Sequence, residues 1–546
     1  QERIVAKNMI LKAGQIPVLY IPYFSQSLKD KSFPIELIPG KNSEWGYHVL
    51  GRWRYNLNEE HKGKIHFDWY EKRGRAGGLT HKMESSQFGE GLFNYYYIDD
   101  ELYSLEEREE LFDEYPERSA IDAKYLEDDR YKAQFSYHWQ PTPHLSVTSE
   151  FNKFSDENFM KDFFEREYEI EPHPLSYTLI DYSFERSSLS LLTQKRANRF
   201  FTETEYLPQL EYDFYSQPLF DSPLYFESQS KIGNLTRQFE RSSLDYDAVR
   251  VYSHNVLSYP KRIAWLHLTP YVGSFSTFYS KNFFGDENIS REALEAGISM
   301  STKIYKMCEG GFSIFGEEID KMRHVITPQL DYAYIHDPTV SGDNLFRFDE
   351  SDELVREERI TFALTNKLEA KNENRVWDFV YFSPSVEYRI NREGEGSFFD
   401  NIKAELEFYP RESFSLTSDT EYDVVDRAFK EANVDFTWRD TEADKYSISF
   451  GHRYARDDSS QSTFQGSYQL TSKLQLRNYL RYEYKTGEFQ EQEYSLRTDL
   501  HCWWMDVGVN IDEGKDFTFW VIFRLKSFPD VHVGFDRTFS GAKEDY

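Results

Sequence analysis

The 546-residue sequence is poor in cysteine and has no long apolar run. Its two cysteines, Cys308 and Cys502, are too few for disulfide bonds to stabilise a fold of this size, and no Cys/His cluster has the spacing of zinc ligands. The densest apolar patches are short pieces such as residues 377–382 (WDFVYF), far below the roughly 18 apolar residues of a membrane-spanning helix. These absences exclude a disulfide-stapled scaffold and a helical membrane protein.

Basic residues are also scarce, since 64 Lys and Arg face 94 Asp and Glu, for a formal charge of −30. Phosphate binding needs clustered cations, so no nucleic-acid partner is predicted. The chain has no G-x-G-x-x-G, P-loop, H-E-x-x-H or G-x-S-x-G motif, and residues 341–351 lack the order of ligands of an EF-hand. We therefore predict no enzyme, no cofactor and no specific metal site. A hydrolase whose catalytic triad is spread over several strands stays open.

Aromatic residues are abundant, at 17% of the chain, and many segments alternate between apolar and polar residues. Residues 473–485 (KLQLRNYLRYEYK) are an example, with Leu and Tyr in one phase and Arg, Gln and Glu in the other. A period of two puts these two sets on opposite faces of a strand. The mean hydropathy of −0.72 is typical of a soluble protein. That average is weak evidence, because a transmembrane strand exposes only every second residue to lipid.

The alternating segments are joined by two kinds of connection. Residues 137–151, 406–422 and 468–482 predict tight hairpins, whereas residues 97–129, 335–358 and 454–462 predict longer, more acidic loops. Short turns at one end and long loops at the other are typical of an outer-membrane barrel. We predict an all-β fold, a large transmembrane antiparallel β-barrel over residues 31–546. At about 20 residues per strand and turn it would have about 26 strands.

Two segments depart from this pattern. Residues 102–115 have apolar residues near helical spacing, which predicts a short helix in the 97–129 loop that caps the extracellular mouth. Residues 16–24 (IPVLYIPYF) are apolar on both faces and carry Pro17 and Pro22, which favour an edge strand or a bulge. Residues 1–30 are therefore predicted to be the end of a separate β domain and its linker. No signal peptide precedes them, so either it has been removed or the chain starts within a longer protein.

Six segments, in order along the chain, resemble the LptD family of outer-membrane lipopolysaccharide-assembly proteins. They are residues 16–24, 33–49, 154–164, 206–214, 324–338 and 500–509. The resemblance implies an N-terminal periplasmic β-jelly-roll, a 26-stranded barrel and a location in the outer membrane of a Gram-negative bacterium. It also implies as partners lipopolysaccharide, the lipid bilayer, an LptE-type plug lipoprotein in the lumen and an LptA-type periplasmic bridge.

In this family lipopolysaccharide leaves through a lateral gate between the first and last barrel strands. Carried over to this chain, the gate comprises Pro34, Ile35, Pro39, Gly40, Gly51, Phe519, Val521, Phe523, Val531 and Val533. Proline cannot donate to a strand ladder, so Pro34 and Pro39 would weaken the first strand. A bend in a domain linker is the alternative. Gly51 lies where the family has a second gate proline, and residues 516–525 and 531–535 are the predicted closing strands.

Cys502 lies where many members of the family have two adjacent cysteines that pair with cysteines of the N-terminal domain. This chain has Cys-Trp there, so the resemblance implies a disulfide partner upstream of Gln1, with a free thiol as the alternative. Cys308 matches no cysteine of the family. Two other functions stay open at this point. One is a porin or receptor barrel that passes solutes through its lumen, and the other is a soluble, acidic β-rich glycan-binding protein or hydrolase.

Overall fold

Strands occupy most of the chain in the computed structural model, as the alternation of apolar and polar residues predicts. The structure describes residues 3–13, 16–27, 35–42, 45–101, 129–240, 242, 244–282, 284–285, 287–373, 375–390, 399–441, 443–501, 503–512, 516–526 and 528–534. Within these ranges no helix is long and apolar enough to cross a membrane.

The elements before residue 300 are β1 (Arg3–Ala13), β2 (Ile16–Ser27), β3 (Ile35–Asn42), β4 (Gly46–Asn56), β5 (His61–Tyr70), β6 (Gly74–Ser85), β7 (Gly89–Asp100), β8 (Asp129–Thr142), β9 (Leu145–Phe154), α3 (Phe159–Phe163), α4 (Glu165–Ile170), β10 (Tyr177–Ser183), β11 (Ser187–Gln194), β12 (Glu203–Pro218), β13 (Tyr225–Gln238), β14 (Asp245–Ser258), β15 (Lys261–Ile263), β16 (Leu266–Lys281) and β17 (Glu287–Ser301).

The later elements are β18 (Ile304–Ile314), β19 (Glu317–Ile335), η2 (Gly342–Asn344), η3 (Glu350–Asp352), β20 (Glu357–Lys371), β21 (Val376–Arg389), β22 (Phe399–Arg411), β23 (Phe414–Asp423), β24 (Ala428–Arg439), β25 (Tyr446–Ala455), β26 (Ser459–Thr471), β27 (Leu474–Glu483), β28 (Glu488–Asp499), β29 (Trp503–Asp512), β30 (Asp516–Leu525) and β31 (Phe528–Gly534).

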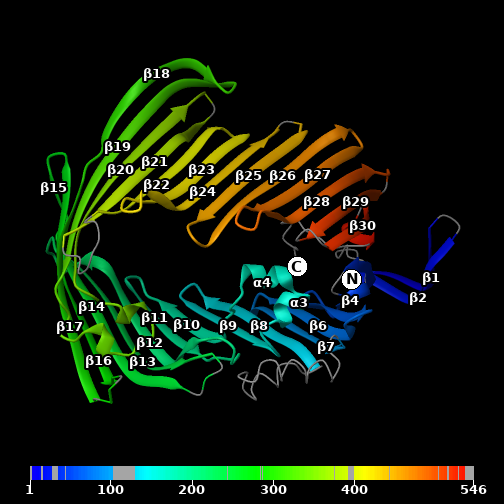
Figure 1. Cartoon of the computed structure of the whole chain (residues 1–546), viewed down its shortest axis with the longest axis horizontal. Coiled ribbons are helices and arrows are strands. Elements are labelled where there is room, and N and C mark those ends of the chain that lie inside the picture. The colour runs from blue at the N-terminus through cyan, green and yellow to red at the C-terminus, as the bar shows by residue number, and fades with distance from the viewer. Residues whose placement is uncertain are drawn as a thin grey trace.

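The strands β3 to β31 form one antiparallel sheet that closes as a barrel, drawn in Figure 1 as a ring of strands. Strands β14 and β15 both pair with β16, and β17 and β18 both pair with β19, so each couple is one interrupted strand of the wall. The described wall therefore has 27 strands, close to the predicted number of about 26. Strands β1 and β2 form a separate two-stranded sheet.

The two faces of the wall differ in chemistry. On β5, Ile65, Phe67 and Trp69 are 37%, 47% and 46% exposed, whereas Asp68 and Tyr70 on the opposite face are only 8% and 3% exposed. Large apolar side chains are exposed in the same way on strands around the wall. A soluble protein would bury them, so this outer face is the lipid-facing band of a membrane barrel and the polar face lines the lumen.

The two ends of the barrel differ in their connections. The predicted tight hairpins are confirmed, because β8–β9, β22–β23 and β26–β27 are each joined by two residues. The opposite end carries long connections, including residues 155–176 and 336–356. The expectation of a long loop within 454–462 was wrong, because β25 and β26 are joined by residues 456–458 alone. The helix predicted at 102–115 lies outside the described residues.

Candidate functional site: the seam and the luminal face

The first and last strands of the barrel meet at a seam. Strand β3 lies beside β30 and β31. The register pairs of its described residues are all with β4, from Ile35 opposite Trp53 to Asn42 opposite Gly46. By contrast, β29 and β30 pair along ten residues, from Trp503 opposite Leu525 to Asp512 opposite Asp516. Among the described residues, backbone pairing is therefore less extensive across the seam than in the adjoining wall.

On the N-terminal side of the seam, Pro39 pairs with Val49 and Gly40 with His48. Pro39 removes one backbone donor from β3. A Cβ atom on Gly40 would lie 1.9 Å from Nε2 of His48, so only glycine leaves room for the imidazole ring across the pair. Pro34 lies outside the described residues, and Ile35 is the first residue of β3.

Gly51 is one strand away from the seam. It lies in β4, where it pairs with Leu37 of β3 and with Phe67 of β5. Its Cβ would approach the Phe67 ring to 2.2 Å, so close packing against an aromatic ring explains this glycine. Its backbone N–H donates to Oδ1 of Asp68 at 2.9 Å.

On the C-terminal side, the predicted residues divide between two strands. Phe519, Val521 and Phe523 lie in β30 and pair with β29, while Phe523 also pairs with Val533 of β31. Val531 lies in β31 as well. The closing strands predicted at 516–525 and 531–535 thus correspond to β30 and to the second half of β31, which begins earlier, at Phe528.

A group of ion pairs, the first luminal cluster, fixes the connection 155–176 to the inner face of the wall. Arg130 of β8 donates through Nε and Nη2 to the two carboxylate oxygens of Asp156, at 2.9 and 2.8 Å. Its Nη1 donates to Asp100 and Asp162, at 2.7 and 2.8 Å. Arg73 pairs with the same Asp100 and Asp162, at 3.0 and 2.9 Å. Two cations and three carboxylates are thereby paired in a largely buried site, as buried charges require.

Aromatic side chains surround this cluster. Phe163 of α3 lies under both guanidinium groups, 4.9 Å from Arg73 and 5.4 Å from Arg130, and it stacks on Trp45. The indole of Trp45 donates to the carbonyl of Asp162 at 3.1 Å. Helices α3 and α4 are drawn inside the ring in Figure 1, against the strands that follow the seam. The first luminal cluster therefore joins the connection 155–176 to Trp45, the residue directly before β4, which is the neighbour of the seam strand.

A hydrogen-bond chain runs from the same region to Gly51. Tyr70 and Tyr96 share a hydrogen bond of 2.9 Å, and the Tyr96 hydroxyl donates to Asp68 at 2.6 Å. Asp68 in turn accepts the N–H of Gly51. All three side chains are buried, so this chain ties β4, β5 and β7 together beside the seam.

A second cluster fixes the connection 336–356 to the wall on the far side of the barrel. Arg250 of β14 donates to both oxygens of Asp349, at 2.7 and 2.6 Å, and to Asp352 at 2.9 Å. The Tyr279 hydroxyl donates to Asp352 at 2.6 Å. Phe346 and Phe348 of the same connection pack on Leu235 and Ala248. Two long connections thus fold back onto the wall, each fixed by a buried arginine.

The electrostatics of the second cluster favour a charged carboxylate. Burial raises the pKa of Asp349, but the hydrogen bonds and charge of Arg250 outweigh it and hold that pKa below its ordinary value. Asp349 also accepts the N–H of Ser351, as the N-cap of η3. The carboxylate is therefore ionised at neutral pH.

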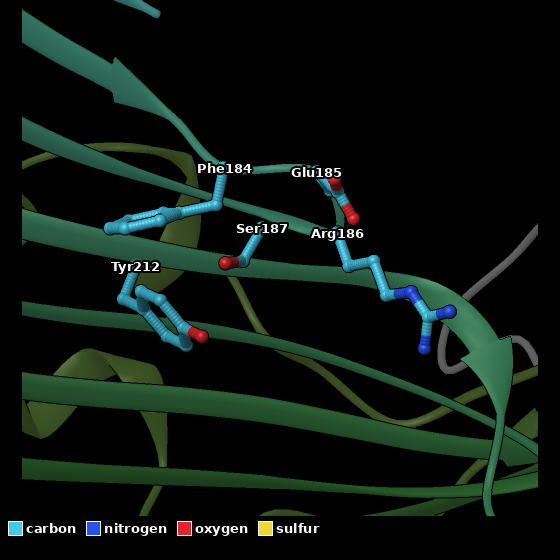
Figure 2. A pocket seen from close by; sticks show the side chains of 5 residues that line it. All are labelled: Phe184, Glu185, Arg186, Ser187 and Tyr212. Carbon is cyan, nitrogen blue, oxygen red and sulfur yellow. The ribbon is translucent and has the colours of Figure 1, made fainter.

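Open hollows are found along the described strands of the wall. One, of about 340 Å³, is lined by residues of the β10–β11 turn and by Tyr212. In Figure 2 the ring of Phe184 lies above that of Tyr212, and Arg186 points away from both. Within the described ranges no group of three or more His, Cys, Asp or Glu is placed to hold a metal ion.

The luminal clusters were not predicted. Residues 154–164 resemble the family, and the spacing of Phe159 and Phe163 is a signal for one helical turn, but neither observation predicts an ion-pair cluster. No sequence signal links Arg130 or Arg250 to their distant carboxylates. Of the two cysteines, Cys308 is a free, exposed thiol on β18, while Cys502 lies outside the described residues.

Comparison with known proteins identifies a family. The model of LptD, described as LPS transport system D, matches residues 128–483, which is more than half of the chain. No curated protein matches. The matched region runs from the start of β8 to the end of β27 and includes both long luminal connections. The match favours lipopolysaccharide transport over the porin and hydrolase alternatives.

Proposed function

The chain belongs to the LptD family, which transports lipopolysaccharide at the outer membrane of Gram-negative bacteria, and from that premise we propose its mechanism. We propose that it inserts lipopolysaccharide into the outer leaflet through a lateral gate between β3 and the strands β30 and β31. The observation that carries the proposal is the seam, where β3 lies beside β30 and β31 while its register pairs are with β4.

The physical argument concerns the cost of opening. Each backbone hydrogen bond contributes about 0.5–1.5 kcal/mol net in water, and an unmade bond costs more in lipid. A seam with few such bonds can separate at a cost that a fully paired strand interface could not. Pro39 supports a role of the seam as a gate, because proline has no backbone N–H and so removes one hydrogen-bond donor from β3.

The partners in this proposal follow from the family. Lipopolysaccharide is the cargo, an LptE-type lipoprotein occupies the lumen, and an LptA-type bridge delivers cargo through the N-terminal domain. The sheet of β1 and β2, separate from the barrel, supports the presence of a second domain at residues 1–30.

A disulfide lock tests the gate. Cysteine pairs that join Leu37 of β3 to Val531 or Val533 of β31 should stop lipopolysaccharide from reaching the cell surface once oxidised, and a reductant should restore it. The matched control joins Ser449 to Gln465, which face each other on β25 and β26, far from the seam. The control lock should leave export unchanged. Normal export with a fully formed seam disulfide would contradict the gate.

A further inference from the structure

Strand β18 extends past its neighbour on one side. Strand β16 pairs with β17 as far as His267 opposite Ser301, and the Thr302 hydroxyl donates to the carbonyl of Trp265, in the β15–β16 turn, at 2.7 Å. Beyond this level β18 continues for eleven residues and pairs with β19, from Ile304 opposite Ile326 onward. Figure 1 shows β18 at the margin of the sheet. Among the described residues, its other edge has no neighbouring strand.

The side chains on this strand are exposed on both of its faces. Every residue from 303 to 309 is exposed. Ile304, Tyr305 and Met307 are 58%, 69% and 55% exposed. Neighbouring large apolar side chains on a surface that faces water are usually covered by another part of the protein or by a partner. Successive residues of a strand point to opposite faces. Both faces of this part of β18, and one of its backbone edges, are therefore covered by no other described part of the protein.

The hairpin that carries this edge is firmly held near its turn. Ile319 of β19 is buried against Ala370 and Phe379, and Ile314 packs against this group. At the tip, the ring of Phe315 stacks on Phe414 at 5.4 Å, and its carbonyl accepts a hydrogen bond from Arg411 at 3.1 Å. The edge is therefore preorganised, which lowers the entropic cost of binding a partner.

The edge lies outside the hydrocarbon layer. A transmembrane strand needs about 9–11 residues, and β17 alone has 15 before β18 begins. The β18–β19 turn is at the tight-turn end of the barrel, which faces the periplasm in outer-membrane barrels. Lipid cannot satisfy the free N–H and C=O groups of an open edge, so insertion of this strand into the bilayer is disfavoured.

We propose that residues 304–309 of β18 bind an extended, acidic segment of a second, periplasmic polypeptide, which adds to the barrel wall as one further strand. Backbone groups of the edge would supply the hydrogen bonds, and Tyr305 and Met307 the apolar contacts. The irregularity in pairing between Glu309 and Phe312 limits the flat part of the edge, and hence the contact, to about six residues.

The charge of the edge selects the chemistry of the partner. Lys303 and Lys306 are exposed and make no ion pair among the described residues, in a chain with a net charge of −30. Carboxylates opposite them would complete cross-strand pairs of opposite charge, which stabilise adjacent strands.

Two synthetic peptides test this proposal on the full chain in lipid nanodiscs. One alternates Glu and Val over seven residues, and the other alternates Lys and Val. The edge should bind the fluorescently labelled Glu peptide on the order of tenfold more tightly than the Lys peptide, measured by anisotropy. Lys306→Glu should remove or reverse that preference, and Lys473→Glu, in the β26–β27 turn at the same end of the barrel, should not.

A second measurement locates the peptide. Cys308 is exposed on β18, so bound Glu peptide should slow its reaction with maleimide, with Cys308→Ser as the blank. Binding of neither peptide would overturn the proposal, as would a preference that Lys306→Glu leaves unchanged or an unprotected Cys308. An environment-sensitive dye on Cys308 that enters anionic phospholipid vesicles without peptide would also overturn it, in favour of membrane contact.

Discussion

Arg130 is the residue on which the first luminal cluster depends. Its guanidinium binds Asp100, Asp156 and Asp162, and it is 8% exposed. Arg130→Gln would leave three carboxylates close together without this cation. Removal of one partner from a buried ion pair costs about 3–5 kcal/mol, so we expect α3 and α4 to detach from the wall.

Hydrogen exchange in residues 159–170 measures this detachment. Arg453→Gln is the matched control, since its pair with Asp435 at 2.6 Å is half exposed, and exposed pairs contribute about 0–1 kcal/mol. Unchanged exchange in Arg130→Gln would show that aromatic packing alone holds the segment.

Asp349 gives the second cluster a defined pH dependence. Its pKa is lowered in the folded state, so it stabilises the docked connection at pH values above the ordinary value of about 3.9. This contribution is lost as the pH falls through the lowered pKa. Protease cleavage within residues 336–356 should therefore stay slow at pH 5–7 and rise only in strong acid. Asp349→Asn should give faster cleavage at neutral pH, and a rise already near pH 6 in the unmodified chain would contradict the assignment.

Single residues were the least predictable level of the site. Pro39 and Gly40 lie in the first barrel strand, and the predicted residues of β30 and β31 lie in the last two. The order of the strands along the chain therefore places them at or next to the seam, and the sequence pattern predicts that order. Gly51 lies in the second strand, where its role is to make room for Phe67. A single sequence does not distinguish a glycine that weakens pairing from one that accommodates an aromatic ring across the strands.

Among the secondary-structure elements, β3 is sensitive to side-chain volume at Gly40. Gly40→Ala would place a methyl group within the His48 ring, and overpacking of this kind costs typically 1–3 kcal/mol. We expect faster hydrogen exchange along β3 and β4. Gly77→Ala on β6 is the matched control, because the nearest atom to its Cβ would be 3.7 Å away. Equal exchange in the two variants would mean that His48 moves aside freely.

Strands and tight turns could be predicted because their causes are local. Alternation and short polar turns mark β26 and β27, and the structure places their turn at residues 472–473. Helices α3 and α4 have only five and six residues, too few to be stable alone. They exist because Arg130, Arg73 and the aromatic cluster hold them, and those contacts lie far away in the sequence.

For the whole molecule, the membrane explains why apolar residues face outward. Phe450 lies in the middle of β25 and is 39% exposed, while Ser449 on the opposite face bonds to Thr437. Phe450→Arg should destabilise the barrel in a bilayer by about 2–4 kcal/mol, because it places a charge near the centre of the lipid layer. Ser449→Arg should cost far less. Unfolding by denaturant in vesicles measures both, and equal losses would contradict the assignment of the faces.

The barrel and its approximate strand number were predictable from periodicity and length alone. The breaks between β14 and β15 and between β17 and β18 were not predictable, because they depend on where a neighbouring hairpin ends. Thr302, for example, ends β17 at the level of the Trp265 carbonyl, a contact between residues 37 positions apart.

Arg130 and Arg250, the buried arginines that anchor the two luminal connections, differ in how far along the chain they lie from their carboxylates, and this sets an order of assembly. The contacts of Arg130 with Asp156 and Asp162 span 26 and 32 residues, so they can form once β8 and β9 exist. The Arg250–Asp352 contact spans 102 residues, and that from Thr204 to the carbonyl of Phe348 spans 144. Closing a longer loop costs more chain entropy and slows folding. The segment beside the seam should therefore be in place early, and the connection 336–356 should dock only when half of the wall has formed.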